Sequence, residues 1–221
     1  MTWEFFDETE ELSRPEDTVE LEPGVTLEHI GLRPEMIESE LNTELGAGTP
    51  EKDAEHWHFQ SEENSCAVAC QEFVAEQLLQ EDFSEQKMLD YAKEKGWYDP
   101  EVGTTGRDVG KLLESIGLEV ERCYDLSLDD LARELDAGAK PICGVNNMIL
   151  ARPELAAIPG QLANHAVEVI GIEQTAEGTR VILNDPGVEG GGGRAVSAST
   201  FLKAWQTGGN YAVIARKGAL A

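Results

Sequence analysis

A cysteine at the start of a predicted helix, with polar residues just before it, is the part of the sequence best suited to covalent chemistry. Cys66 ends the string QSEENSC, which Gln60 opens and in which Asn64 or Ser65 can cap the helix. The positive end of the helix dipole and the free N–H groups of the first turn both favour a thiolate. Such a sulfur can attack a carbonyl carbon, and the Cys66 N–H and the Gln60 amide can donate to the oxyanion that forms.

A histidine and an aspartate far downstream could supply the base that this thiol needs. His165 begins one run of strand-forming residues, and Asp185 ends the next such run. If residues 173–177 form the hairpin loop, Val169 lies opposite Val181 and His165 lies opposite Asp185, all on one face of the sheet. A carboxylate bonded to one ring nitrogen fixes the histidine tautomer and leaves the other nitrogen free to take the thiol proton.

Each of these residues has an ordinary structural interpretation when it is taken alone. Cys66 could pack as a small buried thiol, His165 could be a satisfied strand histidine, and Asp185 with the following proline could form a turn. Their conjunction favours chemistry, because a thiol at a helix start, followed by a histidine and an acid on facing strands, is a known catalytic arrangement.

The elements that must position these residues are four helices followed by a set of strands. Apolar spacing, caps and terminal glycines predict helices at 66–79, 84–96, 105–117 and 127–138, the last two opened by the capping boxes Thr105/Asp108 and Ser127/Asp130. Strands are predicted at 118–123, 141–145, 165–172, 180–184 and 211–215, with a further short helix at 200–206. The run Gly190 to Gly193 is interpreted as a flexible loop. Helices first and antiparallel strands later indicate an α+β fold.

The order Gln60, Cys66, His165 and Asp185 and the strings QSEENSCAVAC, NHAVEVIGI and ILNDPG resemble the papain-like cysteine peptidases. The resemblance is to the bacterial double-glycine, bacteriocin-processing peptidases and their stand-alone relatives in particular, over about residues 56–216. It implies a papain-like fold, with an N-terminal helical half that carries the cysteine and an antiparallel β half that carries the histidine and the aspartate. It also implies that Cys66 is the nucleophile, His165 the general base, Asp185 the orienting residue and Gln60 the oxyanion donor.

The activity implied by this resemblance is thiol-dependent hydrolysis of an amide bond in a peptide or protein substrate, and we expect no cofactor. Ala67 departs from the pattern, because many double-glycine peptidases have a glycine after the nucleophile. The substrate therefore stays open. Acyl or peptidyl transfer uses the same acyl-enzyme and is one alternative. A non-catalytic papain-fold binding or adaptor module is the other.

The chain is strongly acidic, and the acid is concentrated at its N-terminal end. Its formal net charge is −26, with only 17 Lys and Arg, so we expect no nucleic-acid partner. Residues 1–59 hold 17 acidic and 3 basic residues. We therefore predict an acidic, partly disordered N-terminal arm or pro-segment at 1–54, which could bind a partner, and the papain-like peptidase domain at 55–221.

Nothing in the sequence predicts export or a membrane span. The start MTWEFFDETEEL is acidic where a signal peptide is basic and then apolar, and no stretch has the roughly 20 apolar residues of a span. We therefore expect a soluble, cytoplasmic protein with reduced cysteines.

A zinc site is an alternative use for two of the cysteines. Four potential ligands lie within a short stretch: His56, His58, Cys66 and Cys70. Their spacing is not that of a standard zinc finger or knuckle, and ordinary loop or strand-edge polarity explains the two histidines. We therefore expect no metal site.

Overall fold

The computed structural model describes residues 46–218, and its framework is an antiparallel sheet. The strand order is β2-β7-β3-β4-β5-β6, and β1 pairs with β4. The strands are β1 Ala47–Gly48, β2 Glu119–Cys123, β3 Lys140–Val145, β4 His165–Thr175, β5 Gly178–Asn184, β6 Arg194–Ser197 and β7 Ala212–Arg216. The five predicted strands correspond to β2, β3, β4, β5 and β7. The sequence does not predict β1 and β6, because runs of two and four residues are too short to show a period.

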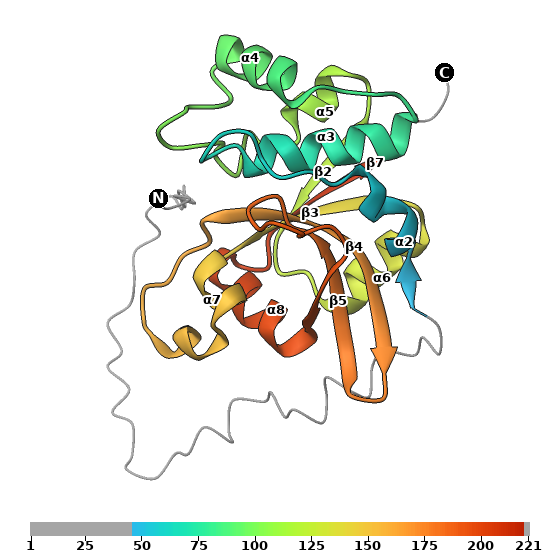
Figure 1. Cartoon of the computed structure of the whole chain (residues 1–221), viewed down its shortest axis with the longest axis vertical. Helices are drawn as coiled ribbons and strands as arrows, with labels where there is room; N and C mark the ends of the chain where they lie inside the picture. Colours follow the sequence, from blue (N-terminus) through green and yellow to red (C-terminus); the bar gives the residue numbers. More distant parts are fainter. Residues whose placement is uncertain (1–45, 219–221) are drawn as a thin grey trace, which may run out of the picture. The chain divides into compact units, whose positions relative to one another are not determined.

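Helices lie on both sides of this sheet (Figure 1). The helices α3 Cys66–Leu79, α4 Glu85–Lys95 and α5 Lys111–Ser115 lie on one side, and α7 Asn147–Ala151 and α8 Ala198–Trp205 lie on the other. The other described helices are α2 Pro50–Asp53, α6 Leu128–Asp136 and the 3-10 turns η2 Ala54–His56, η3 Pro153–Ala157 and η4 Gln206–Gly208. The predicted α+β class is confirmed. Among residues 46–218, no helix has the length and apolar character needed to cross a bilayer.

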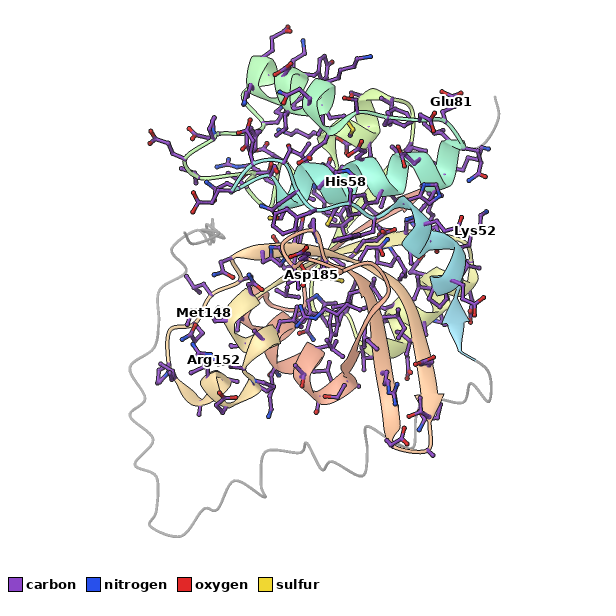
Figure 2. The ribbon with its side chains drawn as sticks, in the orientation of Figure 1. Lys52, His58, Glu81, Met148, Arg152 and Asp185 are labelled. Atoms are coloured by element: carbon purple, nitrogen blue, oxygen red, sulfur yellow. The ribbon has the colours of Figure 1, made fainter. Side chains whose placement is uncertain are left out.

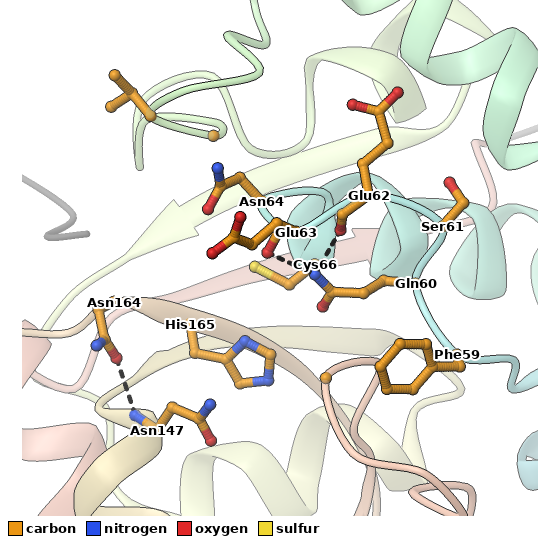
Figure 3. Close-up of a pocket in the computed structure, with 13 residues that line it drawn as sticks. Phe59, Gln60, Ser61, Glu62, Glu63, Asn64, Cys66, Asn147, Asn164 and His165 are labelled. Atoms are coloured by element: carbon orange, nitrogen blue, oxygen red, sulfur yellow. Dashed lines mark hydrogen bonds between the residues drawn. The ribbon is translucent and has the colours of Figure 1, made fainter.

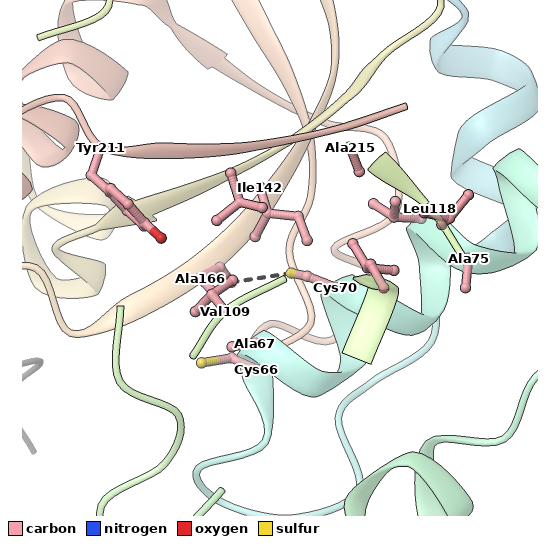
Figure 4. Packing of buried hydrophobic residues seen from close by; sticks show 13 residues of the cluster. Cys66, Ala67, Cys70, Ala75, Val109, Leu118, Ile142, Ala166, Tyr211 and Ala215 are labelled. Carbon is pink, nitrogen blue, oxygen red and sulfur yellow. Dashed lines mark hydrogen bonds between the residues drawn. The ribbon is translucent and has the colours of Figure 1, made fainter. Parts of the chain in front are cut away.

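α3 is buried on both of its long faces, which fixes the position of its first residue. On the sheet side Cys70 packs in a cluster with Ile142 and Ala166 (Figure 4). On the other side Val68 packs with Leu89 of α4. A helix enclosed in this way has few charged residues and many small ones, because both faces must exclude water.

Three of the predicted helices match α3, α4 and α6 within two residues at each end. The predicted stop of α4 is present, since Gly96 adopts the left-handed conformation with φ 71°. The capping box of α6 is also present: Asp130 N donates to Ser127 Oγ at 3.1 Å, and Ser127 N donates to Asp130 Oδ2 at 2.8 Å.

The fourth predicted helix, at 105–117, begins later than the sequence indicates. Thr105 Oγ1 does contact Asp108 Oδ2 at 2.5 Å, but this bond joins two side chains within a run of turns. α5 begins only at Lys111, because Gly110 before it has a left-handed φ of 93°. A Cβ on Gly110 would lie 2.6 Å from Val120 Cγ1, so the glycine also permits the close approach of β2.

The β4–β5 hairpin has a register that differs from the predicted one. Its turn holds only residues 176–177, and Val169 pairs with Leu183 rather than with Val181. A β-bulge after Val169 shifts the pairing within the hairpin. The prediction assumed a longer loop and a regular ladder and was wrong on both points. The error is two residues at Val169, where the side chains keep the predicted face, and three residues beyond the bulge, where Ile172 rather than Val169 pairs with Val181.

The described elements begin before residue 55, the predicted start of the domain. Gly48 of β1 lies opposite Gly171 of β4, and Asp53 of α2 forms a 2.5 Å ion pair with Lys140 of β3. These short elements carry too little periodicity for the sequence to predict them. Residues 1–45 of the predicted arm lie outside the described residues, so the arm stays a prediction.

Candidate active site

Cys66 is the first residue of α3, and it borders a cavity (Figure 3). Ser65 precedes it as the cap residue, but its hydroxyl turns back and donates to the Glu62 carbonyl at 3.0 Å. The Ser65 carbonyl accepts the N–H groups of Val68 and Ala69, both at 2.9 Å. Within residues 46–218 the Cys66 N–H has no such acceptor, so it is a free donor of the first helical turn beside the sulfur.

His165 and Asp185 reach the cavity from the sheet. His165 begins β4, where it pairs with Val145 of β3, and Asp185 directly follows β5. His165 Nε2 lies 2.7 Å from Asp185 Oδ1, and the two side chains are 6% and 0% exposed. The structure therefore brings the two residues together on one face, although they are not directly opposite each other across the hairpin as predicted.

The cavity has a volume of about 440 Å³ and receives residues from both halves of the fold (Figure 3). Its lining consists of Phe59, Gln60, Ser61, Glu62, Glu63, Asn64, Cys66, Val102, Gly103, Asn147, Asn164, His165 and Gly187. Three of the four predicted site residues, Gln60, Cys66 and His165, thus meet at one opening. Asp185 lies behind His165, in contact with its far ring nitrogen.

The groups around His165 stabilise its protonated form. Burial lowers the pKa of His165, but the neighbouring Cys66 sulfur and the hydrogen bond to Asp185 outweigh it and raise this pKa from 6.5 to about 10. Burial raises the pKa of Asp185, but the hydrogen bond and charge of His165 and the charge of Arg194 make the net shift downward. The arrangement favours an imidazolium bonded through Nε2, with Nδ1 on the side of the sulfur (Figure 3).

Gln60 lines the cavity, but both N–H groups of its amide already have acceptors. Nε2 donates to the carbonyls of Glu62 at 2.7 Å and Glu63 at 2.8 Å. Oε1 is buried and has no hydrogen-bond partner among the described residues. Nε2 must leave at least one of these carbonyls before it can donate to an oxyanion. The predicted role of Gln60 therefore stays a prediction.

Sequence reasoning missed the residues that hold Asp185, which lies in the interior of the domain (Figure 2). Arg194 Nη1 donates to Asp185 Oδ2 at 2.5 Å, and the Gly187 N–H donates to Oδ1 at 3.1 Å. The indole N–H of Trp57 donates to the Asp185 carbonyl at 2.8 Å. Both oxygens of the carboxylate and the backbone of this residue are therefore fixed by contacts other than the one to His165.

The glycine-rich loop packs against Asp185. The prediction of a flexible loop did not include this contact. Asp185 N donates to the Gly191 carbonyl at 3.0 Å, and a Cβ on Gly191 would lie only 2.1 Å from the Asp185 carbonyl oxygen. A Cβ on Gly187 would lie 2.8 Å from His165 Cε1. The sequence signal that could have found this contact was the arginine at the end of the glycine run. Arg194 begins a strand that pairs with β5, so its side chain can reach the aspartate at the end of β5.

The residues of the zinc hypothesis do not come together. His56 and His58 each bond a glutamate of α3, and Cys70 Sγ faces a backbone carbonyl of β4. Among the described residues, the group whose potential ligand atoms lie within 4.8 Å of one another is His58, Glu72 and Glu85. Within this group His58 Nε2 lies 2.6 Å from Glu72 Oε2, and Glu85 Oε2 accepts the Ser61 N–H at 2.9 Å.

Comparison with known proteins supports the fold independently. A model of the Peptidase C39 like family matches residues 53–213. The peptidase domain of Streptococcus ComA, described as a bi-functional ABC transporter involved in a quorum sensing pathway, is 19% identical with a TM-score of 0.53, over 73% of this chain and 98% of that one. A putative C39-like peptidase from Bacillus anthracis is 14% identical with a TM-score of 0.56, over 79% and 99%. No curated protein sequence matches the chain.

Proposed function

The chain belongs to the Peptidase C39 like family, and on that premise we propose that it is a cysteine peptidase that hydrolyses amide bonds through an acyl-enzyme on Cys66. One observation carries the proposal. The cysteine that begins α3 shares a cavity with His165, and Nε2 of His165 is hydrogen-bonded to Asp185 Oδ1 at 2.7 Å. A nucleophile, a base and a residue that orients the base are the parts that this chemistry needs.

In the first step the Cys66 thiolate attacks the substrate carbonyl carbon and a C–S bond forms. The imidazolium of His165 then gives its Nδ1 proton to the leaving nitrogen, the C–N bond breaks, and the thioester remains on the sulfur. Neutral His165 next takes a proton from water, whose oxygen attacks the thioester carbonyl. The C–S bond breaks, which releases the acid and restores the thiolate. Asp185 keeps Nε2 protonated throughout, so that Nδ1 carries the exchange.

The oxyanion of each tetrahedral intermediate is stabilised by the free N–H of Cys66. Gln60 is the second donor, once Nε2 exchanges the Glu62 or Glu63 carbonyl for the oxyanion. The exchange keeps one of its two present bonds, because the amide has two N–H groups.

The test is a comparison of wild-type chain and Cys66→Ala against a diverse peptide library, with cleavage products identified by mass spectrometry. Cys123→Ala is the matched control, because Cys123 lies on β2 and does not line the cavity. We expect cleavage by the wild type and by Cys123→Ala, and none by Cys66→Ala. Identical product profiles for the wild type and Cys66→Ala contradict the proposal.

One observation favours the alternative of a non-catalytic binding module. The amide of Gln60 is committed to loop carbonyls, so the second oxyanion donor is not preorganised. Thiol reactivity separates the two functions. An activated Cys66 reacts with iodoacetamide faster than the half-buried Cys123, whereas a binding module shows no such preference. Product analysis with added amines in competition with water separates hydrolysis from acyl transfer.

A further inference from the structure

We propose that Arg194 is a positioning residue of this site, which acts through Asp185 to hold His165 in the orientation that serves Cys66. The inference rests on the proposed function, because it adds one side chain to the same site. It is carried by contacts around a single buried carboxylate.

The two oxygens of the Asp185 carboxylate have separate partners. Oδ1 accepts from His165 Nε2 at 2.7 Å and from the Gly187 N–H at 3.1 Å, whereas Oδ2 accepts from Arg194 Nη1 at 2.5 Å. Rotation of the carboxylate would break the bonds on both sides. While Arg194 holds Oδ2, the carboxylate therefore presents Oδ1 to the imidazole in one fixed direction.

The register of the sheet explains why Arg194 reaches this position. Arg194 is the first residue of β6 and pairs with Leu183 of β5, two residues before Asp185. Because side chains alternate with period two, Leu183 and Asp185 point to the same face, and the arginine opposite Leu183 shares it. Its second nitrogen, Nη2, lies 3.5 Å from the Leu150 carbonyl of α7, so the guanidinium is held from two sides.

The positive charge of Arg194 also helps to keep Asp185 ionised. The Asp185 side chain is 0% exposed, and a buried carboxylate without a cationic partner is costly to keep ionised. His165 is such a partner only while it is protonated, and it gives up its proton in the proposed mechanism. Arg194 is charged at every working pH and is 23% exposed, so it keeps Asp185 ionised when His165 is neutral. An ionised Asp185 accepts from Nε2–H and so leaves Nδ1 unprotonated for the thiol.

The first test measures the tautomer of neutral His165 by imidazole ¹⁵N NMR, in the Cys66→Ala chain with labelled histidine. The variants are Arg194→Gln, Arg194→Lys and the matched control Arg180→Gln. Arg180 lies on β5, is 40% exposed and pairs with Glu177, far along the strand from Asp185. We expect the Nε2–H tautomer to dominate in the parent and in Arg180→Gln, and a mixture of tautomers in Arg194→Gln. Arg194→Lys keeps the positive charge but lacks the planar guanidinium that fixes the geometry of the contact. Its fraction of the Nε2–H tautomer should therefore lie between those of the parent and Arg194→Gln.

The second test measures how fast iodoacetate alkylates Cys66, followed by peptide mass spectrometry in the chain that retains this cysteine. We expect alkylation about tenfold slower in Arg194→Gln, partly recovered in Arg194→Lys and unchanged in Arg180→Gln. Neither measurement needs turnover. A chain that cleaves no peptide would therefore end the proposed function, while the role of Arg194 at the Cys66–His165 pair is still decided by these two readouts.

Thermal unfolding of each variant shows whether it is folded at the temperature of the tests. A folded Arg194→Gln chain with the parent's tautomer and alkylation rate overturns the inference, and so does an equal effect in Arg180→Gln. If Arg194→Gln does not fold, Arg194→Lys decides: parent-like values for both readouts then reduce Arg194 to a structural ion pair and overturn its positioning role.

Discussion

The charge of Asp185 should set the pH at which His165 loses its proton. Against the effect of burial, the Cys66 sulfur and, with it, the hydrogen bond and charge of this carboxylate raise the pKa of His165 to about 10. Asp185→Asn removes the negative charge, so the pKa of His165 should fall, and the basic limb of the kcat/KM profile should move to lower pH by about one unit or more. We also expect kcat at the optimum to fall at least about tenfold, because the amide no longer fixes the tautomer.

The measurement is the pH dependence of kcat/KM for a peptide found in the library screen. Asp125→Asn is a suitable control, since it removes the same charge on a loop outside the cavity. A basic limb that stays near pH 10 in Asp185→Asn would show that Asp185 does not govern the imidazolium.

Single residues were predictable where their chemistry is local. Cys66 at a helix start, and His165 and Asp185 at strand ends of matching parity, are features of short strings of sequence. Arg194 was not predictable in the same way, because its contact depends on how β5 and β6 pair across the glycine-rich loop. The hydrogen bonds of the Gln60 amide to the Glu62 and Glu63 carbonyls were not predictable either, because they depend on the path of the loop backbone.

At the scale of elements, a buried polar group joins α3 to the sheet behind the site. Glu168 of β4 is 0% exposed, and its Oε2 accepts from Gln77 of α3 at 3.1 Å and from Asn184 of β5 at 2.9 Å. Oε1 of Glu168 is buried without a hydrogen-bond partner in the described part of the chain. Burial outweighs the favourable bonds and raises the pKa of Glu168 from 4.5 to about 8.

This raised pKa predicts a stability that falls as the pH rises. Between about pH 4.5 and pH 8 the folded chain holds a proton on Glu168 that the unfolded chain has released, so folding is favoured most at the acidic end. Glu168→Gln cannot titrate. Between pH 5 and pH 8 the free energy of unfolding of the wild type should therefore drop relative to that of Glu168→Gln, by on the order of 2 kcal/mol.

Urea unfolding at both pH values measures this difference, with the exposed Glu94→Gln as a control for the loss of one carboxylate. Parallel changes in the wild type and Glu168→Gln would contradict the prediction, because Glu168 would then be ionised in the folded chain at both pH values.

Element types were predictable from the sequence, but their pairing was not. The periods that mark α3, α4 and β4 are local, and these elements form as predicted. The hairpin register failed because a bulge after Val169 and a two-residue turn leave no signal in the apolar alternation. The late start of α5 also depends on tertiary structure, because Gly110 adopts a left-handed conformation where β2 approaches it closely.

At the scale of the whole molecule, the family resemblance and the papain-like fold predicted from the sequence are confirmed. A prediction about the substrate can be argued from the charge of the cavity and its surroundings. The formal net charge of −26 attracts cations from a distance. Locally, Glu62 and Glu63 are the carboxylates in the cavity lining, and within residues 46–218 no Lys or Arg lines it. Glu62 already binds Lys93 at 3.1 Å. Glu63 is exposed and lies beside Cys66 (Figure 3), so it is available to a ligand.

We therefore expect the site to bind peptides with a lysine near the scissile bond better than matched peptides with glutamine there. Equilibrium binding to Cys66→Ala separates recognition from turnover, and low salt keeps the charges unscreened. The lysine peptide should bind about two- to tenfold more tightly, as an exposed charge pair allows. Adding Glu63→Gln should remove most of this preference, whereas Glu81→Gln, which removes an equal charge from an exposed position outside the cavity lining, should leave it. An equal loss in both would assign the preference to the overall charge of the chain, and no preference in the parent would show that neither charge selects the substrate.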